Sequence, residues 1–409
     1  MNRTFLIIGS IVLVILIGVG LYLRLAPSAQ GTAGQGSGHD FFSAFFPFGN
    51  GGSKNNGGNP SQDQNAGAGA PQKVTERLRK ITSVPTVGGW FVATATTTAS
   101  TTPFSVWYVE RSSGNVYETP IDTYAEMRLS NTTVTGMQEL IPVNASSFIF
   151  RTLIGDDSIS NSLATVATSS DSTLTDASLP PFNRISVSSN GSTMLTVTET
   201  ASGSRVSVSK PDGTGGKTFF TSPIRSWVPL ASNGSLFLET APASGIPGYL
   251  YAIQNDGSLQ KMVGDIPGLM ALPSPSGRYV LYSAASGDSL SLGLIDVKTG
   301  ASYQSPIATL ATKCAWEYED PPTVFCGVSR SVPNASLPDD WLLGNVSLDD
   351  SAWLIQPVTG TAHALGRLGD SAGEAIDVMD PAVSSDGHYA LFTNKNDLTL
   401  WSLDLTRDQ

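Results

Sequence analysis

Hydrophobic and polar positions alternate in a unit that recurs along roughly the last 330 residues, with a spacing near 43. Each copy has a Ser/Asn/Gly turn, an apolar run, a polar gap, a second apolar run and a second Gly turn. The glycines of the first turn are Gly191, Gly234 and Gly277, and those of the second turn are Gly213, Gly257 and Gly300. A repeat of this length with strand character predicts an all-β fold, a β-propeller built from four-stranded blades.

The repeats predict seven blades, each with strands a (innermost) to d (outermost). Their predicted extents are Val87–Thr94 with Phe104–Glu118, Met137–Ile154 with Ser162–Leu174, 184–222, 226–264, 269–308, 312–367 with a long insertion, and Pro381 to Gln409. Asn-Gly and Asp-Gly turns support these hairpins, because both residue pairs tolerate positive φ. In blade one, Ser112-Ser113-Gly114 is interpreted as the c–d turn. Six or eight blades remain alternatives if the Ser/Thr-rich stretch 95–135 contains a different number of strands.

The last blade is short by one strand when the chain ends. The segment Thr75–Thr82, just before blade one, resembles an outer strand and can complete it. Such a closure removes an exposed sheet edge and joins the two ends of the ring.

The N-terminal region has a different composition. Thr4–Leu23 carries no charge and is long enough to cross a bilayer, so residues 1–25 are predicted to be an uncleaved transmembrane anchor. A cleaved signal peptide is the alternative, with a weak cleavage site at Ala26-Pro27-Ser28. The large domain must follow the helix, which places the N-terminus in the cytoplasm and residues 73–409 outside it. Residues 26–72, rich in Gly, Asn and Ser, are predicted to be a flexible linker.

A Phe-rich patch, residues 41–48, interrupts this linker. Its aromatic side chains fit a segment that lies at the lipid interface or on the domain. They also fit a short docking peptide for a partner, so that the chain would be an envelope assembly component.

Three copies of one motif carry a family resemblance. They are Val383–Thr393, Pro273–Ser283 and Ser232–Leu238, each a Ser/Asp/Asn-Gly turn followed by an apolar strand. These segments resemble the repeats of the TolB-like, or WD40-like, propellers. The resemblance covers residues 75–409 and implies the propeller fold and a general habit of binding proteins or peptides.

Composition narrows the chemistry. The net charge is −11 and the pI is near 4.7, so a nucleic-acid partner is disfavoured because phosphate would be repelled. Three histidines and two cysteines leave little material for a metal or redox centre, and no cofactor is predicted. Cys314 and Cys326 flank the turn Glu319–Pro322 symmetrically, so they can form a disulfide across strands a and b of blade six. Two buried free thiols are the alternative.

Two short motifs are weak signals for catalysis. Gly369–Gly373 fits the G-x-S-x-G pattern of serine hydrolases, with His363 or His388 as the base that Ser371 would need. Gly213–Thr218 is similar to a phosphate-binding loop, but it is interpreted as a hairpin turn.

Acidic residues gather in the long connections 119–136, 155–161, 330–350 and 367–380, which are all assigned to one face. The candidate binding residues there are Trp341, Asp339, Asp340, Asp156, Asp157, Asp377 and Asp380, together with acids such as Asp122 and Glu126. This face would dock a basic protein partner or divalent cations, or it would be a solvated rim that aids solubility. Trp341 would be an exposed anchor or would fold back to cap its blade.

Two functions follow. The first is a membrane-anchored extracytoplasmic propeller that binds or scaffolds proteins through its acidic face. The alternative is a hydrolase or lyase with a site at the mouth of the central channel.

Overall fold

The computed structural model describes residues 72–94, 104–155, 158–167, 173–287, 289–331 and 334–406. The predicted anchor, the Phe-rich patch and the linker up to residue 71 lie outside this part of the chain. Within it, no helix has both the length and the apolar character needed to span a bilayer.

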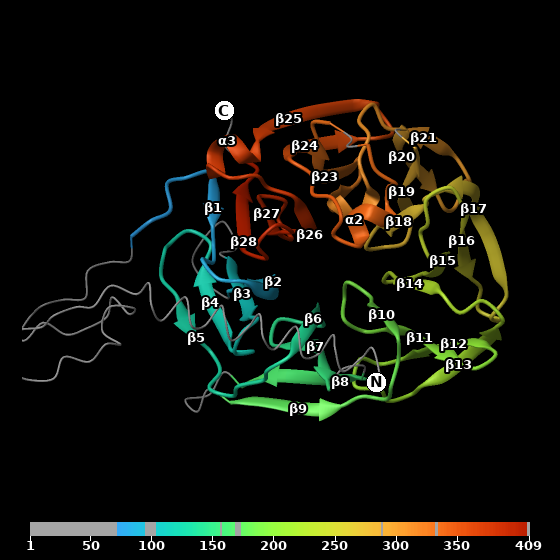
Figure 1. Cartoon of the computed structure of the whole chain (residues 1–409), viewed down its shortest axis with the longest axis horizontal. Coiled ribbons are helices and arrows are strands. Elements are labelled where there is room, and N and C mark those ends of the chain that lie inside the picture. Colours follow the sequence, from blue (N-terminus) through green and yellow to red (C-terminus); the bar gives the residue numbers. More distant parts are fainter. Residues whose placement is uncertain are drawn as a thin grey trace, which may run out of the picture. The chain divides into compact units, whose positions relative to one another are not determined.

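The described residues form seven four-stranded antiparallel sheets arranged around a central axis, as Figure 1 shows. The prediction of an all-β, seven-bladed propeller is therefore confirmed. Sequence order runs from the axis outward in blades one to six, so the first strand of each repeat lines the centre.

The strands of the first four blades follow the repeat pattern. Blade one contains β2 (Thr86–Ala93), β3 (Phe104–Glu110), β4 (Val116–Pro120) and β5 (Met127–Arg128). Blade two contains β6 (Met137–Pro142), β7 (Ser147–Ile154), β8 (Ser158–Val166) and β9 (Leu174–Ser178). Blade three contains β10 (Arg184–Val187), β11 (Met194–Thr200), β12 (Gly203–Ser209) and β13 (Lys217–Ser222). Blade four contains β14 (Trp227–Ala231), β15 (Leu236–Thr240), β16 (Pro247–Ile253) and β17 (Leu259–Pro267).

The remaining blades include three short helices. Blade five contains β18 (Met270–Pro273), β19 (Tyr279–Ser286), β20 (Ser289–Asp296) and β21 (Ser302–Gln304). The 3-10 helix η2 (Ala311–Lys313) leads into blade six, which contains β22 (Cys314–Glu319), β23 (Pro322–Ser329), β24 (Asp350–Gln356) and β25 (Thr361–Arg367). Helix α2 (Asp339–Leu342) lies in its insertion, and α3 (Leu368–Ala372) follows it. Blade seven contains β26 (Val378–Val383), β27 (Tyr389–Asn394), β28 (Leu400–Asp404) and β1 (Leu78–Lys80).

Blade seven joins the two ends of the propeller. Strand β1 pairs with β28 in the register Leu78↔Leu403 and Lys80↔Trp401, and the blue and red strands lie together in Figure 1. The predicted closure by Thr75–Thr82 therefore forms, although its strand is limited to three residues. The inner strand β26 begins at Val378, three residues before the predicted start at Pro381.

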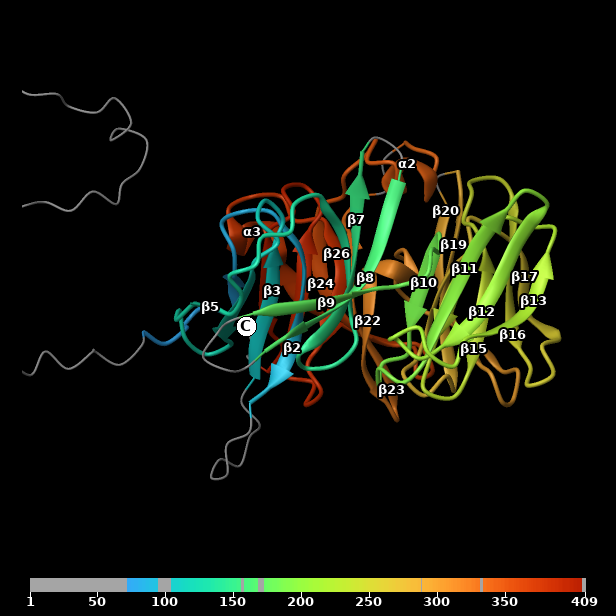
Figure 2. The same cartoon turned by 90° about the horizontal axis from the view of Figure 1, so that it is seen from below.

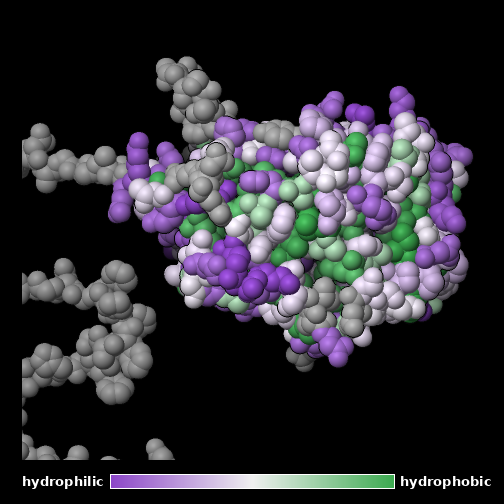
Figure 3. Space-filling model, turned by 90° about the horizontal axis from the view of Figure 1, so that it is seen from above, coloured by the Kyte–Doolittle hydropathy of each residue, from purple (hydrophilic) through white to green (hydrophobic). Residues whose placement is uncertain are grey.

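The core lies between neighbouring blades. Trp90 of blade one packs against Phe148 of blade two with ring centroids 5.4 Å apart, and Phe325 of blade six stacks on Phe392 of blade seven at 6.3 Å. The outer strands bury less. Strand β25, for example, is mostly exposed, and Figure 3 shows hydrophobic and hydrophilic residues mixed along this rim. Burial between blades therefore stabilises the ring, while the rim stays mixed.

Strand connections separate the two faces of the ring. The b–c and d–a connections, which include α2, α3 and the tip of the β7–β8 hairpin, lie at the top in Figure 2, and we call this side the b–c face. The a–b and c–d turns lie on the other side, the a–b face. Gly191 and Gly277 close a–b turns with φ of 67° and 74°, a region that glycine enters without steric cost.

One predicted turn in blade one is wrong. The residues Ser112-Ser113-Gly114 connect β3 to β4, which makes them the b–c turn, whereas the c–d connection is 121–126. The outer strand has only two residues, Met127 and Arg128, so no alternating pattern marks it. As a consequence, Asp122 and Glu126 lie on the a–b face, away from the acids of blades six and seven.

Candidate docking face and central channel

The predicted acids of the blade-six insertion serve first to hold the insertion together. Asp339 accepts a hydrogen bond from the Ser244 backbone N–H at 2.8 Å and thereby links α2 to blade four. Asp340 accepts from Asn345 Nδ2 at 3.0 Å and from the Ser336 N–H at 2.7 Å. These hydrogen bonds, the one from Asn345 first, lower the pKa of the Asp340 carboxyl. Asp156 and Asp157 lie outside the described residues.

Trp341 is not an exposed anchor. Its side chain is only 4% exposed, and its Nε1 donates to Asp377 Oδ1 and Oδ2 at 3.1 and 3.0 Å. The indole ring also lies over the ammonium groups of Lys313 and Lys395, at 5.0 and 5.3 Å. The ring caps blade six, because an indole with an available charge-assisted acceptor gains more from burial than from exposure. Its predicted role as a surface contact is therefore wrong.

Asp377 belongs to a buried ionic cluster rather than to the surface. Lys313 Nζ donates to Asp377 and lies 2.8 Å from Asp350 Oδ2, and all three side chains are fully buried. Asp377 also accepts from the Leu348 N–H at 2.9 Å, and Asp350 accepts from the Val378 N–H at 2.7 Å. Burial raises the pKa of Asp350 to about 6, although the Lys313 ammonium opposes the shift. We call Lys313, Asp350, Asp377 and Trp341 the ionic cluster.

The sequence pattern did not identify Lys313 as a partner. It stands alone in a stretch of apolar and small residues, Ile307–Cys314, and an isolated lysine in an apolar stretch is the only signal that could have suggested a buried cation. The cluster lies between blades six and seven and fixes the insertion there. Its acids are therefore structural and unavailable to a partner.

A hollow of about 510 Å³ on the b–c face lies beside this cluster. Its acidic lining consists of Asp349, Glu374 and Asp397, and Asn394 and Asn396 add amide groups. Lys80 Nζ lies 2.6 Å from Glu374 and 3.4 Å from Asp397, so one cation serves at least two of the carboxylates. The hollow therefore keeps an acidic character, and we call it the acidic hollow.

Large apolar side chains are exposed mainly on the same face. Eleven such side chains are exposed among the described residues, and eight of them lie in or next to b–c and d–a connections. These eight are Val84, Leu153, Ile154, Ile159, Ile224, Ile246, Leu342 and Leu343. Single exposed apolar residues are ordinary, but their concentration on one face is typical of a contact surface. No local sequence pattern marks this feature, because the residues come from separate loops.

Cys314 and Cys326 form a disulfide with their Cα atoms 4.1 Å apart. The two residues are direct partners in the β22–β23 register, so the hairpin brings the sulfurs together. Both are buried, and the bond is structural.

Asp380 lies away from the acidic hollow, on the innermost strand β26, where it lines the central channel. Of the predicted acids that the structure describes, it is the one that lines the channel. The channel cavity is about 400 Å³, and its other lining residues are mostly apolar.

Neither short motif forms an enzyme site. Ser371 is on α3 at the b–c face, whereas His388 is in an a–b turn on the opposite face and His363 is within β25. Gly213–Thr218 is the turn between β12 and β13, with no helix after it. Among the described residues, no three His, Cys, Asp or Glu side chains gather in a way that could hold a metal ion.

We compared the chain with known proteins by sequence and by structure. No protein-family model matches the sequence, and no curated protein matches it. An oligogalacturonate lyase in complex with manganese is similar in structure, with a TM-score of 0.52 and 11% identity, over 79% of this chain and 99% of the lyase chain. TolB from Acinetobacter baumannii matches with a TM-score of 0.41 and 10% identity, over 73% of this chain and 62% of TolB.

At such identities these matches show the fold alone. Together with the seven four-stranded sheets, the match to the lyase agrees with the propeller fold that the repeats predict. The propeller fold implied by the resemblance of the sequence repeats to TolB-like repeats is therefore present in the described residues.

Proposed function

We propose that this chain is a membrane-anchored, extracytoplasmic propeller that binds a protein partner on its b–c face. The concentration of exposed apolar side chains on that face carries the proposal. Interfaces combine apolar anchors with a polar rim, and this face offers both, with Leu343 (74% exposed) and Ile154 (58% exposed) as anchors.

The acidic hollow suggests the charge of the partner. Asp349, Glu374 and Asp397 would attract a segment that presents Lys or Arg beside apolar side chains. Electrostatic attraction of this kind raises the association rate and weakens with added salt. Trp341, which is buried, takes no part in this contact.

The location rests on two observations. The apolar run Thr4–Leu23 is long enough to anchor the chain in a bilayer. A disulfide such as Cys314–Cys326 forms and persists in an oxidising compartment outside the cytoplasm. Cell fractionation with and without residues 1–25 tests the anchor, and release of the truncated chain from membranes supports it. Protease treatment of intact cells tests the orientation. A domain that the added protease cannot reach would overturn the extracytoplasmic location.

The docking face is tested by site-specific crosslinking in the source cells. A photo-crosslinking residue is placed at Leu343 or Ile154, and at Val358 on the a–b face as the matched control. We expect the same partner to crosslink at the first two positions, to be lost with Asp349→Lys, and not to crosslink at Val358. Crosslinking at Val358 alone, or a partner unaffected by Asp349→Lys, would contradict the proposed face.

A further inference from the structure

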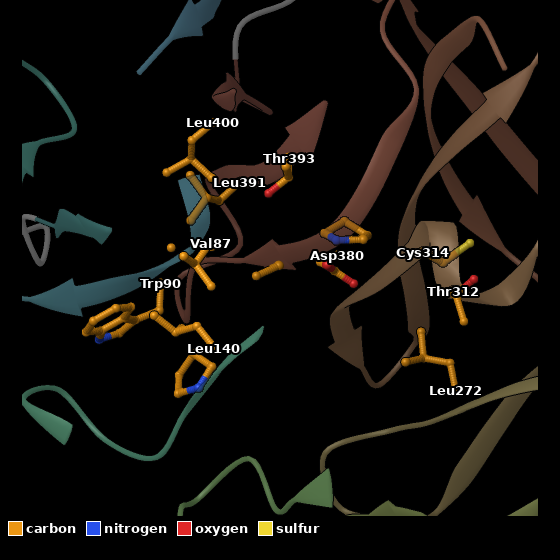
Figure 4. A pocket seen from close by; sticks show the side chains of 15 residues that line it. Val87, Trp90, Leu140, Leu272, Thr312, Cys314, Asp380, Leu391, Thr393 and Leu400 are labelled. Carbon is orange, nitrogen blue, oxygen red and sulfur yellow. The ribbon is translucent and has the colours of Figure 1, made fainter. Parts of the chain in front are cut away.

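The central channel has the properties of a small-molecule site. Its cavity of about 400 Å³ lies within the range of ligand pockets and is bounded by strands of blades one, two, five, six and seven. Figure 4 shows apolar side chains on both sides of the opening, among them Val87, Leu140, Leu272 and Leu391. Asp380 is the only charged residue among the described residues that line it.

The backbone turns Asp380 toward the cavity. Its φ is +49°, in the left-handed region, and the pairing of β26 with β27 shifts register between Met379 and Ala382. A bulge next to a functional site often re-aims one side chain. The left-handed conformation costs free energy for a residue with a Cβ, although Asp and Asn tolerate it better than most. The strand therefore departs from regular geometry at the one residue that carries charge into the channel.

No cation compensates Asp380 among the described residues. Enclosure by the protein raises the pKa of its carboxyl, and the Glu139 carboxylate raises it further. The Asp380 side chain is nevertheless open to solvent, because the channel reaches it. The Arg151 guanidinium forms an ion pair with Glu139 at 2.6 Å and donates to the Asn183 carbonyl oxygen at 2.9 Å.

An accessible carboxylate inside an apolar cavity is stabilised by a cation that brings its own apolar surface. Anions are repelled by the Asp380 carboxylate. A metal ion would need further ligands, and no group of three is present among the described residues. Thr312 and Thr393 line the same cavity and offer hydroxyl groups to an ammonium.

We propose that the central channel binds a small organic cation, a primary amine with an apolar body. The ammonium pairs with Asp380, and the apolar body contacts Leu140, Leu272 and Leu391. This site is independent of the protein partner proposed for the b–c face.

The test is titration calorimetry on the full chain in detergent. The probes are phenethylamine, tyramine, cadaverine and agmatine, with 3-phenylpropionate as an anion of similar shape. We expect at least one amine to bind and 3-phenylpropionate not to bind. Asp380→Asn should weaken amine binding by about 10- to 100-fold, since a hydrogen bond to a charged group is lost while asparagine keeps the left-handed backbone.

Two further variants complete the test. Ala382→Phe places a ring in the cavity and should abolish binding, whereas Asp370→Asn, an exposed acid on α3, should leave it unchanged. A circular dichroism melt verifies that each variant is folded. Absence of binding by all four amines, equal binding of the anion, or unchanged affinity in folded Asp380→Asn would overturn the proposal.

Discussion

The seam between blades six and seven and the seam between blades four and five both bury carboxyl groups, but they treat them differently. At the first seam, Asp350 and Asp377 share the Lys313 ammonium. At the second, Glu239 is 2% exposed and accepts one hydrogen bond, from the Ala271 N–H at 3.0 Å, while its Oε1 has no partner. Burial raises the pKa of Glu239 well above its usual value, with only that hydrogen bond opposing it.

The difference shows how one fold accommodates buried acids in two ways. A shared cation stabilises the ionised form of the two carboxylates. Asp377 then accepts hydrogen bonds from Trp341 and Leu348 of the blade-six insertion and so holds the insertion against the ring. Without a cation, the carboxyl is driven toward its neutral form, and its seam becomes sensitive to pH.

The largest effect is expected from removing the shared cation. Lys313→Met keeps much of the side-chain volume but leaves Asp350 and Asp377 buried without compensation, so the free energy of unfolding should fall by about 3–5 kcal/mol. Urea denaturation measures the change. Lys80→Met is the matched control, because that ammonium is in a partly exposed ion pair, and it should cost less than about 1 kcal/mol. Equal effects of the two variants would remove the distinction between the sites.

The disulfide next to Lys313 is a covalent constraint within blade six, where it joins strands β22 and β23. Replacing both Cys314 and Cys326 with alanine should lower the free energy of unfolding by about 2–4 kcal/mol, since the unfolded chain regains the entropy of the closed loop. Thermal melts with and without reductant measure this. Reductant should lower the melting temperature of the unmodified protein and leave the double variant unchanged, and insensitivity of both would show that the bond does not form.

The second seam predicts a pH dependence. Because the pKa of Glu239 is raised in the folded state, its contribution to stability is present below the pKa of the unfolded chain and is lost as pH rises toward the folded value. Glu239→Gln removes this loss and should raise stability at pH 8 by about 1–3 kcal/mol, the scale of an unsatisfied buried polar group.

Urea denaturation of the parent protein and of Glu239→Gln between pH 4 and pH 8 measures this difference. Glu199→Gln, a substitution of an exposed residue on β11, is the control. Parallel stability curves for the parent and Glu239→Gln would show that Glu239 does not titrate on unfolding.

The smallest effect is expected where ions meet on the surface. Arg367 and Asp370 form an i,i+3 pair at 3.1 Å with side chains 45% and 60% exposed. Arg367→Gln should change the unfolding free energy by less than about 0.5 kcal/mol, because water screens the pair. The same urea measurement applies, and a loss above 1 kcal/mol would mean that surface pairs also hold blade six in place.

The alternating pattern and the turn residues were sufficient to predict the blades. Blade three was predicted as 184–222 and its strands run over the same range, because alternation and Asp-Gly turn chemistry are local properties. The prediction for blade one was wrong at its outer strand, because this strand, Met127–Arg128, is too short to show an alternating pattern. The pairing of Cys314 with Cys326 also followed from sequence, since the two residues flank one hairpin turn symmetrically.

The sequence by itself therefore determined the modular architecture, its closure by residues before blade one, and the acidic character of the chain. Only the tertiary structure decided which acids meet solvent, a partner cation or the channel. Lys313 and Asp377 are 64 residues apart in sequence, and Trp341 is buried by donating to the same carboxylate. Burial and charge compensation depend on residues from different blades, and a pattern that reports only neighbouring positions carries no information about them.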